Sequence, residues 1–400
     1  MLTRRTFLRA SAAGFALAAC PLPGRLARAA TSRDVLVALY LRGGADGLSL
    51  IVPHGDPEYA TLRPTLALPE SELIPMTGFF GMNGNFGELA SLYASGQMAA
   101  IHCVGSTDDT RSHFDAQDYM ERAAPGDKSV SDGWLNRYLA LAGEGNVLAG
   151  ISLGWSDEES LAGPAANLSL SSLSEFRFQG SFPEERKAAI RALHAAHPQS
   201  LLSMRTEEAL AVEETLSSVS TDTNVTYPQG GLGYRLRDLA ALIRADVGVH
   251  VAGLSMGGWD HHDAEIEQLG PATSNLSACL GAFYQDLGVD ANRVLTLVMT
   301  EFGRTVQENG TFGSDHGRGS IMLALGGGVS GGNLLLKDGV WPGLAQNPSG
   351  PRRDLEVTTD FRDVFAEVLN RHLGVSMADL GGIFPSFAPD ANNFPGLFSA

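Results

Sequence analysis

The stretch from Asp34 to Leu48 reads DVLVALYLRGGADGL, and it decides the fold. The run from Asp34 to Leu41 is almost continuously apolar, which is typical of a strand buried on both faces of a parallel sheet. Glycines then turn the chain, and Asp46 follows the turn. In open α/β sheets, ligands bind beyond the carboxyl ends of the strands. Asp46 is therefore the first candidate site residue.

Similar apolar runs recur along the chain and alternate with helical patterns. The runs lie at residues 98–104, 147–153, 249–254, 294–300 and 321–325. The clearest helical patterns lie at residues 114–123, 134–142, 183–196, 232–245, 274–287 and 361–373. This alternation predicts an α/β fold with a mostly parallel central sheet flanked by helices. We expect a single domain over residues 30–400, with loop insertions near residues 53–81, 161–182 and 215–231.

Acidic and imidazole side chains stand beside glycines after two of these runs and in a third motif further on. The motifs are GGWDHH at residues 257–262, EFGRT at 301–305 and GSDHGRG at 313–319. Carboxylates and imidazoles are the ligands that zinc, manganese and similar ions take. We therefore predict a site for one or two divalent metal ions, with zinc, manganese and calcium left open. Its predicted ligands are Asp46, Asp260, His262, Glu301, Asp315 and His316.

A candidate nucleophile follows the second apolar run, where a helix is expected to begin near Ser112. A hydroxyl at a helix N-terminus beside a metal ion is suited to attack phosphorus or sulfur. The alternative is that Ser112 only caps the helix. His113 would be a metal ligand or an acid–base group. Arg304, with Arg111 and Arg318, would hold an anionic substrate bidentately, although structural salt bridges are the equal alternative.

The N-terminus carries an export signal. Arg4 and Arg5 precede an apolar pair and a short small-residue stretch, which predicts a twin-arginine (Tat) signal peptide over residues 1–29. Cleavage is expected after Ala29. A competing lipobox ends at Cys20, and acylation there would anchor the protein to lipid. The expected location is the periplasm or cell envelope.

Composition limits the partners. The formal net charge is −17, and removal of the signal takes away five arginines and no acidic residue, which leaves −22. A surface this acidic argues against nucleic acid and anionic membranes. An anionic ester would need local positive charge from metal or arginine. The mature chain contains no apolar run long enough for a transmembrane segment.

Together these motifs resemble the Tat-exported bacterial family known as domain of unknown function 1501. The resemblance rests on the segments RGGADGL at 42–48, RSHFDAQ at 111–117, GGWDHH at 257–262, EFGRT at 301–305 and DHG at 315–317. Family members commonly carry Thr at the position of His261, so Asp260 and His262 are the matching pair and His261 is an optional extra ligand. The family is in turn similar to a remote branch of the alkaline-phosphatase and sulfatase superfamily.

That resemblance implies an alkaline-phosphatase-like sheet and a function. The leading hypothesis is an exported metal-dependent hydrolase of phosphate or sulfate esters with Ser112 as nucleophile. The alternative is a non-catalytic periplasmic binding or assembly protein on a decayed hydrolase fold, acting with an exported protein partner.

Overall fold

The computed structural model describes residues 33–399 except 155–156, 179 and 347–349. The predicted signal peptide and both predicted cleavage sites lie outside these residues. Within the described chain, no helix combines the length and apolarity needed to cross a bilayer.

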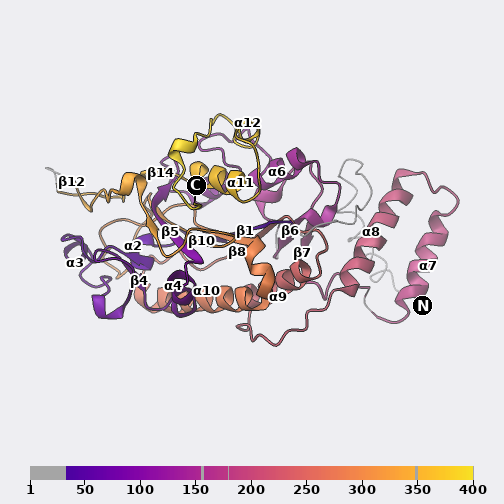
Figure 1. Cartoon of the computed structure of the whole chain (residues 1–400), viewed down its shortest axis with the longest axis horizontal. Helices are drawn as coiled ribbons and strands as arrows, with labels where there is room; N and C mark the ends of the chain where they lie inside the picture. Colours follow the sequence, from indigo (N-terminus) through magenta and orange to yellow (C-terminus); the bar gives the residue numbers. More distant parts are fainter. Residues whose placement is uncertain (1–32, 155–156, 179, 347–349, 400) are drawn as a thin grey trace.

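A nine-stranded sheet forms the centre of the molecule (Figure 1). Its main path runs β11 (Leu334–Leu335), β5 (Met98–Gly105), β10 (Ser320–Gly326), β9 (Val294–Met299), β1 (Val35–Leu41), β8 (Val251–Met256), β6 (Gly150–Leu153) and β7 (Leu168–Leu170). The ninth strand, β14 (Thr359–Asp360), pairs with β5 outside this path. Each of the six predicted apolar runs overlaps one of these strands, which confirms the expected α/β sheet.

The direction of β10 determines where the candidate residues meet. β10 is antiparallel to both of its neighbours, β5 and β9, whereas the other pairs in the sheet are parallel. The chain between β9 and β10 therefore leaves and re-enters the sheet at the same edge, the one where the parallel strands end. This edge receives Glu301 after β9 and His316 before β10.

Helices cover both faces of the sheet (Figure 1). One layer contains α4 (Gly87–Ala94), α9 (Gly231–Arg244) and α10 (Glu265–Leu287), and the other contains α6 (Trp134–Ala142), α11 (Phe361–Arg371) and α12 (Met377–Leu380). Side chains of β1 alternate between the layers: Val35, Val37 and Leu39 join the first core, and Leu36, Ala38 and Tyr40 join the second. Both faces of β1 are thus buried, as its apolar run predicts.

Two helices differ from expectation. α10 begins at Glu265 rather than near residue 274 and carries Pro271 within it. α8 (Leu201–Ser218) was not predicted, because its apolar residues do not gather on one side of the helix. With α7 (Pro183–His194), α8 forms a hairpin beyond the β7 end of the sheet (Figure 1).

Short elements complete the chain. They are α2 (Gly47–Leu50), α3 (Tyr59–Leu62), α5 (His113–Glu121), the small sheet of β2 (Ile51–Val52), β4 (Gly81–Asn83) and β3 (Leu73–Pro75), and the pair β12 (Ala345–Gln346) and β13 (Gly350–Pro351). Residues 53–81 and 161–182, predicted as loop insertions, therefore include α3 and β7.

Candidate metal centre

Three residues from distant parts of the chain bring potential ligand atoms together. These are His113 at the start of α5, Asp260 in the loop after β8, and His316 just before β10. Their ligand atoms all lie within 4.8 Å of one another. His262 joins them, because its Nε2 lies 2.9 Å from His316 Nε2 and 3.0 Å from Asp260 Oδ1. Three of the predicted ligands, Asp260, His262 and His316, are thus brought together.

The loop that carries Asp260 lies against the glycine turn after β1. Gly43 adopts a φ of 123°, and a Cβ atom there would lie 2.6 Å from the backbone nitrogen of Asp260. A side chain at this position would therefore push the two loops apart. Glycine is required for this close approach.

Each of the three histidines uses its Nδ1 to donate a hydrogen bond to an oxygen behind it. His113 Nδ1 lies 2.8 Å from Glu301 Oε1, and His316 Nδ1 lies 2.8 Å from the backbone oxygen of Arg111. His262 Nδ1 lies 3.2 Å from Asp315 Oδ1. Carbonyl and carboxylate oxygens only accept hydrogen bonds, so each Nδ1 carries the proton. In the neutral rings, every Nε2 then presents a lone pair.

These lone pairs point at one another and at a carboxylate, which is the chemistry that a cation satisfies. His113 Nε2 is buried and has no hydrogen-bond partner, although it lies 3.3 Å from Asp260 Oδ2. Metal-bound histidines almost always donate their other ring nitrogen to a carboxylate or carbonyl, as all three do here. The residues therefore fit a divalent metal ion held by three imidazoles and one carboxylate.

The charges around Asp260 keep it ionised. Burial tends to raise the pKa of Asp260, but the hydrogen bond and the charge of Arg304 outweigh burial and lower the pKa to about 2. Burial likewise opposes ionisation of Glu301, yet hydrogen bonds from His113 and Gln117 hold the pKa of Glu301 below its ordinary value. The hydrogen bond to Glu301 raises the pKa of His113. Two carboxylates thus remain charged on opposite sides of the His113 ring.

Glu301, predicted as a ligand, stands behind His113. Its side chain is buried and accepts hydrogen bonds from the Gly43 backbone at 2.9 Å and from Gln117 Nε2 at 2.9 Å, as well as from His113. Asp315, also predicted as a ligand, is half exposed, and its carboxylate accepts a hydrogen bond from His262 Nδ1. Both carboxylates therefore orient imidazoles.

Arg304, expected to bind an anionic substrate, is almost fully buried. Its Nε donates to the Gly44 carbonyl at 2.7 Å, and its Nη1 donates to the Ser314 carbonyl at 3.1 Å. Its Nη2 donates to the Trp259 carbonyl at 3.0 Å and to Asp260 Oδ1 at 2.7 Å. The guanidinium thus ties three site loops together and does not face solvent.

Asp46 lies outside the group of three, contrary to the prediction of a common site. Its carboxylate forms a buried ion pair with Arg63, whose side chain is fully buried, and it also accepts from the Leu48 backbone. Glu265 lies against this pair, and burial followed by the charge of Asp46 raises the pKa of Glu265 to about 8. Arg63 supplies the positive charge that a metal ion was expected to supply to Asp46.

Other candidates are also held by protein groups. His261 is buried and is not one of the three converging imidazoles. Burial lowers the pKa of His261. Arg111 pairs with Asp354 at 2.5 Å, and Arg318 donates to the Ser106 carbonyl at 3.4 Å. Ser112 caps α5, with its Oγ accepting from the Asp115 backbone at a long 3.5 Å.

Sequence reasoning missed Gln117 and Arg63. Gln117 lies on α5, and its amide joins Glu301 to Arg42, whose Nη1 lies 3.0 Å from Gln117 Oε1. Gln117 belongs to the segment 111–117, so the resemblance of that segment to the family could have identified it. Arg63 lies in the predicted insertion 53–81, where no motif pointed to a functional residue.

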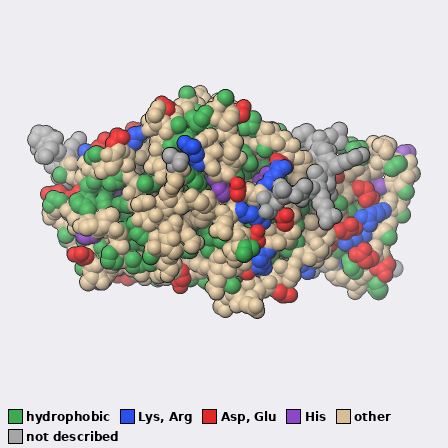
Figure 2. Space-filling model, viewed as in Figure 1, with side chains coloured by type: hydrophobic (Ala, Val, Ile, Leu, Met, Phe, Trp, Pro, Cys, Tyr) green, Lys and Arg blue, Asp and Glu red, His purple; other side chains and the backbone are tan. Residues whose placement is uncertain are grey.

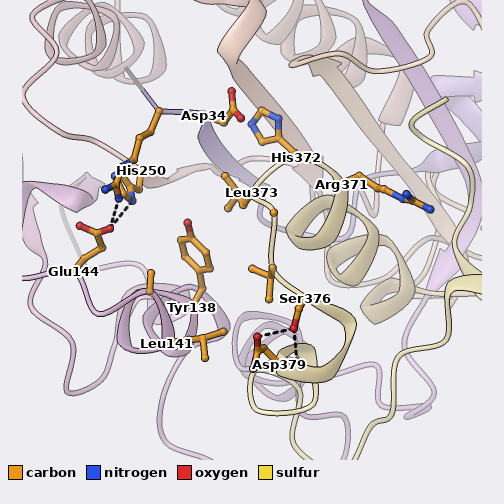
Figure 3. A pocket seen from close by; sticks show the side chains of 14 residues that line it. Asp34, Tyr138, Leu141, Glu144, His250, Arg371, His372, Leu373, Ser376 and Asp379 are labelled. Atoms are coloured by element: carbon orange, nitrogen blue, oxygen red, sulfur yellow. Dashed lines mark hydrogen bonds and ion pairs between the residues drawn. The ribbon is translucent and has the colours of Figure 1, made fainter. Parts of the chain in front are cut away.

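A cavity of roughly 740 Å³ lies at the opposite edge of the sheet, where β1 and β8 begin. Figure 3 shows its lining, which includes Tyr138, Glu144, His250, His372 and Asp379. None of the predicted site residues lines it. The candidate metal ligands instead lie at the edge where ligands of α/β sheets usually bind.

The fold and this cluster define a class of protein: an α/β sandwich with a candidate metal centre beyond the carboxyl ends of its strands. The chain belongs to the family described as Protein of unknown function (DUF1501), whose model matches residues 96–377. The match spans all four residues of the converging group. A search of curated proteins found no match.

Three solved structures illustrate the likeness in fold at low sequence identity. The PsFucS1 sulfatase from Pseudoalteromonas sp. is 12% identical, with a TM-score of 0.39 over 94% of this chain and 72% of that chain. A protein in the alkaline phosphatase superfamily from Vibrio parahaemolyticus is 10% identical, with a TM-score of 0.35 over 93% and 76%. The C-terminal periplasmic domain of EcEptC from Escherichia coli, in complex with Zn, is 8% identical, with a TM-score of 0.35 over 77% of each chain. With TM-scores below 0.5, none of these likenesses assigns a chemistry to this chain.

Proposed function

We propose that the protein is a metal-dependent hydrolase of phosphate or sulfate esters. The observation that carries the proposal is the convergence of three imidazole Nε2 atoms on Asp260, each ring held from behind by an acceptor. Nitrogen donors favour zinc or manganese over calcium, which prefers oxygen ligands. Three imidazoles and one carboxylate best suit zinc.

The residues available for such chemistry surround the cluster. A divalent ion bound there would polarise an ester oxygen and offset developing negative charge. Asp260, His262 and Asp315 each keep more than two-fifths of the side chain exposed, so an ester group in solution has access. His113, His262, His316 and Asp260 would hold the ion, while Glu301 and Asp315 fix the rings.

Ser112 is the proposed nucleophile because both of its neighbours in the chain contact the cluster or belong to it. The backbone oxygen of Arg111 accepts a hydrogen bond from His316, and His113 is a proposed ligand. Attack by the Ser112 hydroxyl would form a bond from Oγ to phosphorus or sulfur and release the alcohol with the serine proton. Water would then hydrolyse the ester of Ser112 and restore the hydroxyl.

The capping bond of Ser112 favours a second candidate. If its Oγ serves only the Asp115 backbone, the chain is a metal-containing binding or assembly protein without ester hydrolysis. An exported protein partner would then be expected.

Ser112→Ala separates the two functions. If Ser112 is the nucleophile, the variant should keep its metal content and lose hydrolysis of chromogenic phosphate and sulfate esters. As a cap alone, its loss should cost about 1 kcal/mol of stability and leave activity unchanged. Asp260→Ala should lose both metal and activity. If metal-replete protein turns over none of these esters, the binding function stands instead.

We also propose export by the twin-arginine route, with cleavage after Ala29 or acylation at Cys20. The receptor reads the arginine pair rather than charge alone. Replacing both Arg4 and Arg5 by Lys should leave precursor in the cytoplasm, and normal export would contradict the assignment. Intact-mass analysis of the mature protein distinguishes the two processing sites.

A further inference from the structure

The end of the α7–α8 hairpin presents leucines to solvent. The hairpin tip, residues 192–204, contains the last residues of α7, a tight connection and the first turn of α8. Leu193, Leu201 and Leu202 are 78%, 57% and 67% exposed. Exposed apolar side chains grouped in this way mark a surface that contacts a partner or a lipid.

The tip is also free of charge, whereas the rest of the hairpin is not. The thirteen residues from 192 to 204 include no Asp, Glu, Lys or Arg, and Arg191 and Arg205 bound them on either side. Below them, ion pairs join the two helices: Arg191 binds Glu207 at 3.1 Å and Glu214 at 2.8 Å. Figure 2 shows red and blue side chains together at the right-hand end of the molecule, where Figure 1 places the α7–α8 hairpin. The hairpin therefore changes from charged to uncharged along its length.

Three polar side chains of the tip, those of His194, Ser200 and Ser203, have hydrogen-bond partners within the hairpin. Ser200 caps α8 by accepting from the Ser203 backbone at 3.2 Å, and the hydroxyls of Ser200 and Ser203 lie 2.8 Å apart. The two ring nitrogens of His194 lie 3.3 Å from Ser203 Oγ and 3.4 Å from Thr206 Oγ1. Because these groups are paired inside the tip, moving it out of water leaves few of them without a partner.

The shape of the apolar surface selects the kind of partner. A helix that docks in a protein groove presents apolar residues along one face at i, i+3, i+4 and i+7. Here they gather at the end of two antiparallel helices, so contact is end-on. A stable protein interface needs roughly 20–30 residues on each side, which is more than the tip provides. A lipid layer sets no such minimum area.

We propose that the hairpin tip inserts into the surface of a zwitterionic lipid layer, with the ion pairs of Arg191 remaining in the aqueous phase. The formal net charge of the chain without its predicted signal peptide is −22, which opposes binding to anionic lipid. Apolar insertion without basic residues is insensitive to salt, unlike binding through a polybasic patch. The inference does not depend on the metal centre.

Flotation of the chain from residue 30 onward, which lacks the predicted signal peptide and Cys20, with phosphatidylcholine vesicles tests the proposal. Wild-type protein should float equally at low and high salt, and addition of phosphatidylglycerol should weaken its binding at low salt. Changing Leu193, Leu201 and Leu202 together to Gln should weaken partitioning by at least about a hundredfold, from the lost apolar transfer energy. Because these side chains are exposed, the helical content of the variant should match that of wild type.

Val289→Gln provides the matched control, since Val289 is 88% exposed and lies outside the hairpin. This variant should bind vesicles as wild type does. Wild-type protein that fails to float, or a triple variant that floats as well as wild type, overturns the proposal. Concentration-dependent dimers that the triple variant abolishes, without vesicle binding, would instead assign the tip to contact between copies.

Discussion

Glu301 acts on the site through His113. Four donors surround its buried carboxylate: the His113 ring, the Gln117 amide, the Gly43 backbone and the Thr300 hydroxyl. The carboxylate fixes the tautomer of His113 and makes its Nε2 a stronger donor to a cation. In the proposed metal centre, Glu301 would therefore contribute to metal affinity, although it is not placed as a ligand.

Glu301→Gln should lower metal affinity by about tenfold to a hundredfold, because a neutral amide polarises the His113 ring less. Metal titration of the apoprotein measures this change. Glu267→Gln makes the same chemical change at an exposed position of α10 and should leave affinity unchanged. An unaltered dissociation constant in Glu301→Gln would contradict the orienting role.

Asp363 on α11, away from the candidate metal centre, should make the stability of the fold depend on pH. Burial and then the nearby charge of Asp360 raise the pKa of Asp363 to about 7, against the partial relief of Lys337 and Arg362. The folded protein therefore keeps a proton that the unfolded chain releases near pH 4. Stability should fall as pH rises from about 4 to about 7, and this loss is complete above pH 7.

Asp363→Asn should remove that loss. We expect the variant to be more stable than wild type at pH 8 by roughly 1–2 kcal/mol, a value reduced for solvent screening, and to show no such gain near pH 4. Urea unfolding at the two pH values measures the difference. Equal stabilisation at both values would show that the carboxylate does not titrate as described.

At the scale of elements, the loop between β9 and β10 is packed too closely to accept side chains in some places. A Cβ atom on Gly317 would lie 2.3 Å from the backbone oxygen of Arg304. This close contact sets the position of the neighbouring residue His316, which forms an isolated antiparallel β-bridge with Arg304.

Gly317→Ala should therefore displace the backbone next to His316. The free energy of unfolding should fall by about 2–3 kcal/mol, and bound metal measured by elemental analysis should fall with it. Gly310→Ala in the same loop meets no atom within 4 Å and should change neither quantity. Full metal content in Gly317→Ala would show that the loop can relax without moving the ligand.

The strands could be predicted because apolar runs are local signals. A common site for Asp260, His262 and His316 could be expected because ligands of α/β sheets bind beyond the carboxyl ends of the strands. The sequence did not predict that Asp46 pairs with Arg63, since the burial of an arginine in a loop depends on contacts distant in sequence. The direction of β10 was likewise invisible, because an apolar run reads the same for either orientation. α8 could not be predicted because its apolar residues do not lie along one side of the helix.

At the scale of the whole molecule, the proposed metal ligands come from the chain near residues 113, 260 and 316. A metal ion that binds only the folded protein stabilises it by mass action, by about 4 kcal/mol when free metal exceeds the dissociation constant a thousandfold. Chelation with EDTA should therefore lower Tm, and added zinc should restore it. Asp260→Ala should show no chelator-dependent shift, and an equal shift in that variant would place the metal elsewhere.

The order of the sheet also has a consequence for biosynthesis. β5 carries His113 into place through α5, yet the strands that pair with β5 are β10, β11 and β14, all of which follow residue 319. A chain emerging from the ribosome therefore holds β5 without a sheet neighbour until about four-fifths of the protein has been made. The candidate metal centre is completed at the same late stage, so metal uptake at the proposed site would report that synthesis has passed β10.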